Sequence, residues 1–304
     1  MELPVLVTLP SGALVQRLGP EGFVGRGVKG PIPLESVETE RGARRILFVV
    51  ENAKRVPEAA RKIEAAVIRE IVSKADAEDV FGLLTARGPR KEIRFGESRE
   101  SLQAAANEIE AGMKGKNQED AVLDSVYEGA GWFQPGRAGD AIFVLTMGIE
   151  KNNQVSFDKV RDRLTGAGIR VFGFQLGMLI SGYIYGGVGM GPGGQLIPTA
   201  NISANRENFF ALSMDTGGFA SLENAEGDPQ KRYRLTDERL RVVQYMAAQE
   251  YKAAVEYYRV RVQNPPKEMV LDLAEAIRKQ IPQAMVIYPK TALACSPYSN
   301  SPKH

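Results

Sequence analysis

The chain has 304 residues, of which 43% are hydrophobic and 25% are charged, values typical of a globular protein with one large or two modest domains. Its 39 Lys and Arg nearly balance 37 Asp and Glu, so no basic surface for nucleic acid is predicted. The one cysteine, Cys295, excludes an internal disulfide, and the one histidine, His304, is the last residue, which argues against histidine-based metal sites and catalysis.

The N-terminal segment predicts a hairpin followed by a further strand. Residues 5–15 consist of two apolar stretches around the turn sequence Pro10-Ser11-Gly12, and residues 31–38 predict another strand. No stretch of the chain reaches the roughly 18 apolar residues of a membrane span. Residues 1–10 lack the basic start and apolar core of a signal peptide, so no such peptide is predicted.

The middle of the chain predicts an α/β fold, because continuous apolar runs alternate with amphipathic stretches, as in a parallel sheet covered by helices on both faces. A short, more polar run at 91–95 predicts an antiparallel edge strand. The spacing fits the right-handed crossovers of a Rossmann-like sheet. The predicted buried strands are 46–50, 80–86, 141–146 and 169–176, and the predicted helices begin at Pro57-Glu58 or span 102–109, 121–126, 157–164 and 208–213.

A glycine-rich stretch at 186–194 contains Gly189-x-Gly191-x-x-Gly194. A nucleotide-binding fingerprint requires a helix directly afterwards, whereas residues 195–198 are extended in pattern, so a hairpin inserted at 178–200 is predicted instead. A connector at 228–232 and a helix at 237–248 come next. Strands predicted at 257–263, 269–273 and 284–288 then combine with the N-terminal strands into a small accessory β module.

Several of these segments resemble the von Willebrand factor A (VWFA) fold, and within it the VWFA-related proteins of acidobacteria. Residues 5–23 resemble the leader of that group, 46–50 its first central strand, 141–148 its fourth and 169–177 its fifth, while Asp215-Thr216-Gly217-Gly218 resembles its helix-end Thr-Gly-Gly and 288–295 the ending of related chains. The resemblance covers nearly the whole length. It implies a VWFA-like α/β domain at 42–222, with an N-terminal β segment at 1–41 and a linker, helix and C-terminal β segment at 223–304.

The resemblance also implies where a metal site would lie. The family's metal-ion-dependent adhesion site uses an Asp-x-Ser-x-Ser loop, a Thr and a later Asp, because Mg²⁺ requires a shell of oxygen ligands. Here Glu51 stands for the first Asp, Ala53 and Arg55 for the two serines, Asp120 for the Thr and Met147 for the later Asp. This degenerate pattern predicts a site without a metal, and no other cofactor is predicted.

Arg55 would place a positive charge where the cation would lie, and guanidinium groups pair readily with carboxylates. One hypothesis is an ion-pair cluster of Glu51, Arg55 and Asp120, and the alternative is a solvated loop with unpaired side chains. The prediction is a non-enzymatic protein-binding, adhesion or scaffolding module that uses loops at the C-terminal ends of the strands. Lys54 or Arg55 would attract acidic groups on the protein partner, whose identity is open.

Two alternative functions remain. Asp215-Thr216-Gly217 matches the aspartic-protease triplet, whose chemistry needs two carboxylates that share a proton, so a hydrolase would have to be a homodimer. The other interpretation of this triplet is a helix C-terminus stopped by Gly217 and Gly218. The second alternative is a structural subunit that assembles with copies of itself. The compartment also stays open, because the resemblance implies export for many relatives and no signal peptide is visible.

Overall fold

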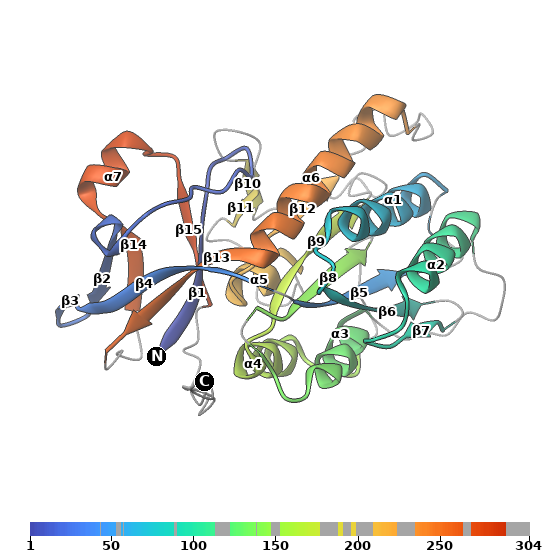
Figure 1. Ribbon diagram of the computed structural model, residues 1–304, viewed down its shortest axis with the longest axis horizontal. Helices are drawn as coiled ribbons and strands as arrows, with labels where there is room; N and C mark the ends of the chain where they lie inside the picture. The colour runs from blue at the N-terminus through green and yellow to red at the C-terminus, as the bar shows by residue number, and fades with distance from the viewer. Residues whose placement is uncertain are drawn as a thin grey trace.

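The computed structural model describes residues 1–42, 44–52, 56, 58–87, 90–112, 122–137, 139–146, 153–176, 188–190, 196–198, 209–223, 235–263 and 269–289. These residues form a six-stranded, mostly parallel sheet with helices on both faces, and beside it a smaller part made of antiparallel sheets (Figure 1). The predicted α/β architecture and the accessory β module are both confirmed.

The central sheet has the strand order β12-β9-β8-β5-β6-β7. All neighbours are parallel except β7, which is antiparallel to β6 at the edge, as the polar run at 91–95 predicted. The apolar runs lie in the middle strands, and β12 is an additional edge strand that the sequence did not predict. The bounds are β5 (Arg45–Glu51), β6 (Val80–Arg87), β7 (Glu92–Ile93), β8 (Ala141–Thr146), β9 (Arg170–Leu176) and β12 (Ala220–Glu223).

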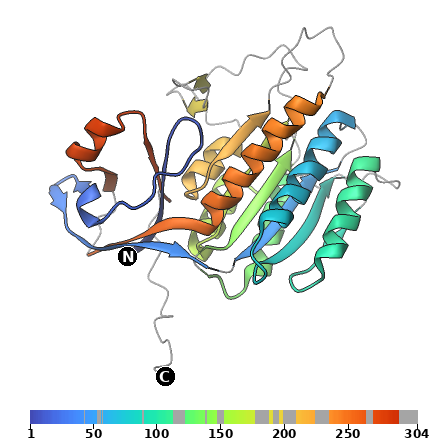
Figure 2. The ribbon, with the colours of Figure 1, turned by 45° about the horizontal axis from the view of Figure 1, so that its top comes forward.

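Helices cover both faces of this sheet. One face is covered by α1 (Glu58–Lys74), α2 (Arg99–Ala111) and α6 (Asp237–Val255), and the other by α3 (Val122–Ala130), α4 (Phe157–Ala167) and α5 (Phe209–Asp215), with the short turn η2 (Gly131–Phe133) after α3 (Figure 2). Successive strand residues point to opposite faces, so Phe48 packs in the layer under α1 while Leu47 and Val49 pack in the layer on the α3 side. Two apolar layers therefore hold the sheet in place.

The accessory β module combines strands from both ends of the chain. Its two sheets have the orders β15-β1-β13-β4 and β14-β2-β3, and β1 pairs with β13 on one side and with β15 on the other. Side chains such as Val5, Tyr258 and Leu271 form its core. The bounds are β1 (Glu2–Thr8), η1 (Pro20–Gly22), β2 (Phe23–Gly27), β3 (Gly30–Ile32), β4 (Leu34–Arg41), β13 (Glu256–Val262), β14 (Met269–Leu273), α7 (Glu275–Gln280) and β15 (Met285–Ile287).

The predicted N-terminal hairpin is present in a short form, in which the Leu9 amide donates to the Ala13 carbonyl and the Val15 amide to the Val7 carbonyl, both at 2.8 Å. The Gly12 amide donates to the Leu9 carbonyl at 2.9 Å, but the returning chain makes one isolated bridge, between Thr8 and Leu14, and forms no strand. The Tyr258 hydroxyl holds the chain after the turn, because it donates to the carbonyl of Val15 at 2.9 Å and accepts from the Leu18 amide at 3.1 Å. The sequence pattern also missed β2 and α7.

The glycine-rich stretch does contain a hairpin. Strands β10 (Val188–Met190) and β11 (Leu196–Pro198) pair antiparallel. The start of the predicted insertion, residues 178–187, and the connector at 228–232 lie outside the described residues.

Helix α6 is longer than predicted and continues into β13 without a loop. Arg170, fully buried at the start of β9, donates to the carbonyls of Ala253 at 3.2 Å and Ala254 at 2.5 Å, and Arg44 donates to that of Val255 at 3.4 Å. These carbonyls have no partner within a helix, and cations stabilise this negative end of the helix dipole. Burial lowers the pKa of Arg170 to about 10.

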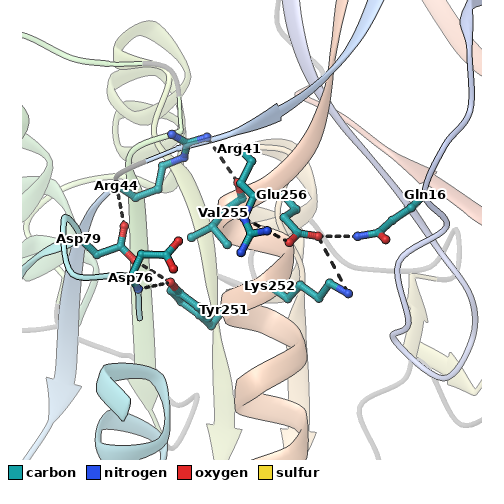
Figure 3. A network of polar contacts seen from close by, with 9 residues as sticks. All are labelled: Gln16, Arg41, Arg44, Asp76, Asp79, Tyr251, Lys252, Val255 and Glu256. Atoms are coloured by element: carbon teal, nitrogen blue, oxygen red, sulfur yellow. Dashed lines mark hydrogen bonds and ion pairs between the residues drawn. The ribbon is translucent and has the colours of Figure 1, made fainter. Parts of the chain in front are cut away.

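A polar network surrounds the point where α6 becomes β13 (Figure 3). Glu256, the first residue of β13, accepts a hydrogen bond from Gln16 and forms ion pairs with Arg41 at 3.6 Å and with Lys252 at 4.0 Å. These partners come from the N-terminal loop, the end of β4 and the last turn of α6. The network therefore joins β4, which leads into the central sheet, to α6, which leads out of it.

A second branch of this network holds α6 against the loop after α1 (Figure 3). The Tyr251 hydroxyl donates to the carboxyl of Asp79 at 2.6 Å and accepts from the Asp76 amide at 3.1 Å. Asp79 also accepts from the Arg44 amide at 2.8 Å. Burial, and next the hydrogen bond to Asp79, raise the pKa of Tyr251.

We predict that Arg170→Met destabilises the protein by about 2–4 kcal/mol, because two buried carbonyls at the end of α6 lose their donor. Urea unfolding measures the effect, with Arg241→Met, at an exposed position of α6, as the control. A midpoint equal to or above that of the unmodified protein would contradict the prediction and show that the cost of burying the guanidinium outweighs its hydrogen bonds.

Candidate functional site

The carboxyl edge of the central sheet carries a row of buried polar side chains. Four parallel strands have one at or near this end, although their other residues are mainly apolar: Glu51 on β5, Thr85 on β6, Thr146 on β8 and Gln175 on β9, all 5% exposed or less. Open α/β sheets bind their ligands at this edge, where the connecting loops meet. This row is the candidate site.

Glu51 lies at the centre of the row and is fully buried. The Thr146 hydroxyl donates to its carboxyl oxygen Oε2 at 2.7 Å, which is possible because β8 lies directly beside β5. Burying a carboxyl group is costly unless it is hydrogen-bonded, so Thr146 stabilises Glu51 in place. The residue at the first position of the expected metal loop is thus bound by the protein's own side chain.

A second buried carboxyl group comes from α1. Glu64 is fully buried, and its two carboxyl oxygens form no hydrogen bond with any residue that the structure describes. Burial and then the charge of Glu51 raise the pKa of Glu64 well above the ordinary 4.5, while Arg61 lowers it by a smaller amount. Glu64 is therefore a neutral acid beside Glu51 over a wider pH range than an exposed glutamate.

Two further side chains organise the loops of this edge. Asp124, in the first turn of α3, accepts hydrogen bonds from the amides of Gln154 at 3.0 Å and Val155 at 2.8 Å, and so fixes the chain before α4. Arg61 on α1 donates to the carbonyl of Val56 at 2.7 Å and fixes the chain after β5. Both contacts secure the bases of loops that leave the sheet at this edge.

Of the predicted site residues, the structure describes Glu51 alone. Ala53, Lys54, Arg55, Asp120 and Met147 lie outside the described residues. The ion-pair cluster of Glu51, Arg55 and Asp120 therefore stays a prediction.

The described side chains do not form a metal centre by themselves. In this part of the chain no three His, Cys, Asp or Glu residues are grouped closely enough to hold a metal ion. Mg²⁺ requires a near-octahedral shell of oxygen ligands and is usually bound through carboxylates. The carboxyl groups described nearest the centre of the row are Glu51, already bound by Thr146, and Glu64, whose neutral form is a poor ligand. No chemical step can be assigned to a metal at these residues.

The Asp215-Thr216-Gly217 triplet ends a helix, as one of its two interpretations predicted. The Gly217 amide donates to Met214 at 3.1 Å and the Gly218 amide to Ser213 at 2.9 Å, and the φ of Gly217 is 83°. The Thr216 hydroxyl donates to carbonyls of α5 and accepts from the Val171 amide at 3.0 Å. The threonine thus joins α5 to β9.

The sequence could have revealed part of what was missed. Thr146 stands as a polar residue at the end of the apolar run 141–145, as Glu51 does after the run 46–50, and this shared position could have paired the two. Glu64 interrupts the apolar stripe of α1, which is a sign of a buried acid. For Asp124 no such signal exists, because it is one of several acidic residues near a helix start and its loop partners come from 30 residues further on.

The described sheet, mostly parallel with one antiparallel edge strand and covered by helices, is the architecture that the VWFA resemblance implied. No protein-family model and no curated protein matches the chain. Three solved structures that match are an aerotolerance-related membrane protein from Bacteroides fragilis, BatB from Bacteroides thetaiotaomicron and a von Willebrand factor type A protein from Catenulispora acidiphila.

The chain is 16% identical to each of the two Bacteroides proteins, and the alignments cover 69% of it and 99% and 100% of those proteins, with TM-scores of 0.44. For the Catenulispora protein the identity is 11%, the coverage 82% of this chain and 50% of that one, and the TM-score 0.44. These likenesses concern the fold, and no function is drawn from them. Among the described helices, none is both long and apolar enough to cross a membrane.

We predict that Thr146→Val destabilises the protein by about 1–2 kcal/mol, because the valine keeps the shape of the threonine but leaves the buried Glu51 without this hydroxyl donor. The urea midpoint measures the loss. Thr39→Val on the accessory β module is the control, since Thr39 is exposed. Equal midpoints for Thr146→Val and the unmodified protein would show that the hydroxyl contributes nothing.

We predict that Glu64→Gln becomes increasingly stabilising, relative to the unmodified protein, as the pH rises. A folded-state pKa above the unfolded value gives stability that is complete below about pH 4.5 and lost as the pH rises to the folded-state pKa. Glutamine cannot ionise and avoids this loss. Urea midpoints between about pH 5 and pH 8 test this, with exposed Glu58→Gln as the control. Parallel curves for Glu64→Gln and the unmodified protein would refute it.

Proposed function

We propose that this protein is a non-enzymatic protein-binding module, of adhesion or scaffolding type, which recognises its partner through the loops at the carboxyl edge of the central sheet and does so without a metal. The observation that supports this most is the state of Glu51. It is fully buried and accepts a hydrogen bond from Thr146, so it serves the architecture of the edge.

The residues of the loop after β5 support a site without a cation. Ala53 and Arg55 stand where the family's site has serine hydroxyls, and Met147 stands where it has an aspartate. None of these side chains offers an oxygen. A divalent ion would also have to displace the charge of Arg55, which is permanently protonated at neutral pH.

The same loop suggests the chemistry of the partner. Lys54 and Arg55 follow one another, and no acidic residue lies between Asn52 and Pro57. Two adjacent cations at the edge where α/β folds bind ligands favour a partner with acidic groups. Such attraction weakens with salt, because mobile ions screen exposed charges over roughly 10 Å.

The test is capture of the partner from an extract of the source organism on the immobilised full-length protein, with and without EDTA. We expect a specific partner that remains bound in EDTA and is depleted by about tenfold or more on the Lys54→Ala/Arg55→Ala variant, since tenfold corresponds to about 1.4 kcal/mol. Lys74→Ala, which removes an exposed cation at the C-terminal end of α1, away from the loop after β5, is the control.

Three outcomes would contradict the proposal. A partner lost in EDTA, together with Mn²⁺ binding that Glu51→Ala abolishes in calorimetry, would establish a metal site around Glu51. Without a foreign partner, a mass in solution above that of the monomer would favour the self-assembling subunit. Proteolysis at acidic pH that Asp215→Asn abolishes would favour the dimeric aspartic hydrolase.

A further inference from the structure

A third buried glutamate lies away from the candidate site, on the helix that connects the two parts of the molecule. Glu250 is 1% exposed and lies on α6, five residues before the helix ends at Val255. Its two carboxyl oxygens make no hydrogen bond within the described part of the chain. The Ser221 side chain on β12 and the amides of Gly173 and Ser221 act on it without reaching hydrogen-bond geometry.

The position of α6 gives Glu250 its importance. The helix packs against α1, β9 and β12 and then continues directly into β13 of the accessory β module (Figure 2). It is thus part of the layer that covers one face of the central sheet and also one of the two chain segments that join this sheet to the module. Any loosening of the last turns of α6 would alter both its packing on the central sheet and its connection to the accessory β module.

No cation is placed to neutralise Glu250. Arg170, on the adjacent β9, directs its guanidinium to the carbonyls of Ala253 and Ala254, and Lys252 pairs with Glu256. Next to Glu250, the Tyr251 hydroxyl binds Asp79, and α1 carries its own buried acid, Glu64, on which Glu51 and Arg61 act. No charged group from α1, β9, β12 or α6 itself shifts the pKa of Glu250, so an ionised carboxylate here would be buried without a cation, with the Ser221 side chain and the amides of Gly173 and Ser221 as the polar groups that act on it.

We propose that the C-terminal half of α6 is a pH-sensitive latch, which lies closed on β9 and β12 while Glu250 carries its proton and loosens when Glu250 ionises. The latch is defined as residues 243–255. It adds regulation of the joint between the two parts of the molecule and does not depend on the proposed binding function.

The direction of the effect follows from burial. Transfer of an unpaired carboxylate into an apolar layer is far more costly than transfer of the neutral acid. Accordingly, burial raises the pKa of Glu250 well above 4.5, whereas the neighbouring Ser221 side chain and the amides of Gly173 and Ser221 lower it by smaller amounts. The latch is most stable below about pH 4.5 and weakens as the pH rises toward the pKa of the folded state.

Hydrogen exchange of the intact chain tests this proposal. We expect the protection factors of the latch amides, corrected for the intrinsic pH dependence of exchange, to fall by about tenfold per pH unit in this window, because opening releases one proton. In Glu250→Gln they should stay level, since glutamine reproduces the shape of the neutral acid. Glu238→Gln, which changes an exposed acid of the same helix, should behave as the unmodified protein.

A comparison within the unmodified protein keeps the test decisive if Glu250→Gln folds poorly. The fall in protection should be confined to the latch, whereas α3 and α4, on the other face of the sheet, should keep theirs. A fall shared by all helices would reveal global unfolding and overturn the proposal. So would protection of the latch that is independent of pH, or the same pH dependence in Glu250→Gln.

Discussion

The structure depends on the uninterrupted passage of α6 into β13. A helix that becomes a strand without a loop leaves its last carbonyls in the interior, where water cannot bind them, and an unpaired carbonyl there is costly. Arg170 and Arg44 supply the missing donors from β9 and from the start of β5. Both arginines also lie over the ring of Tyr257, the second residue of β13, so the ring shields the guanidiniums while they bind the helix end.

This joint explains how chain ends that are far apart in sequence build one module. β4 leads into the central sheet and β13 leads out of it, and the two strands pair along their whole length, from Glu256 beside Arg41 to Val262 beside Leu34. The chain thus enters and leaves the central sheet through two adjacent strands, β4 and β13. β1 and β15 extend this pair on the β13 side. The accessory β module is thereby attached to the α/β part by a pair of hydrogen-bonded strands.

Buried acids recur where functional properties are expected. Glu51 has a hydroxyl partner and marks the carboxyl edge, while Glu64 and Glu250 have no hydrogen-bond partner among the described residues and lie under neighbouring helices of one layer. Burial of such groups lowers stability compared with apolar residues of the same size, so they make the α1–α6 layer sensitive to pH. The opposite layer, under α3, α4 and α5, has an apolar cluster, and the buried acid of its described helices is Asp215 at the end of α5.

The sequence by itself determined the central sheet, because each inner strand must be apolar on both faces and such runs are visible in isolation. It also determined the antiparallel edge strand and the helix end at Gly217 and Gly218. It did not reveal β2, β12 and α7, which are short and owe their form to their neighbours. The length of α6 was another failure, since the pattern indicated an end near Ala248 and the helix reaches Val255.

For the site, sequence reasoning located Glu51 at a strand end. Only the tertiary structure showed that Thr146 binds Glu51 and that Glu64 lies beside it, because Thr146 and Glu64 are 95 and 13 positions away along the chain. The same holds for Glu250. Nothing in the sequence distinguishes it from the exposed acids of α6, and its burial follows from the way the helix lies on β9 and β12. Periodicity along the chain determined which segments pack, whereas contacts between distant segments decided which polar groups lost their water.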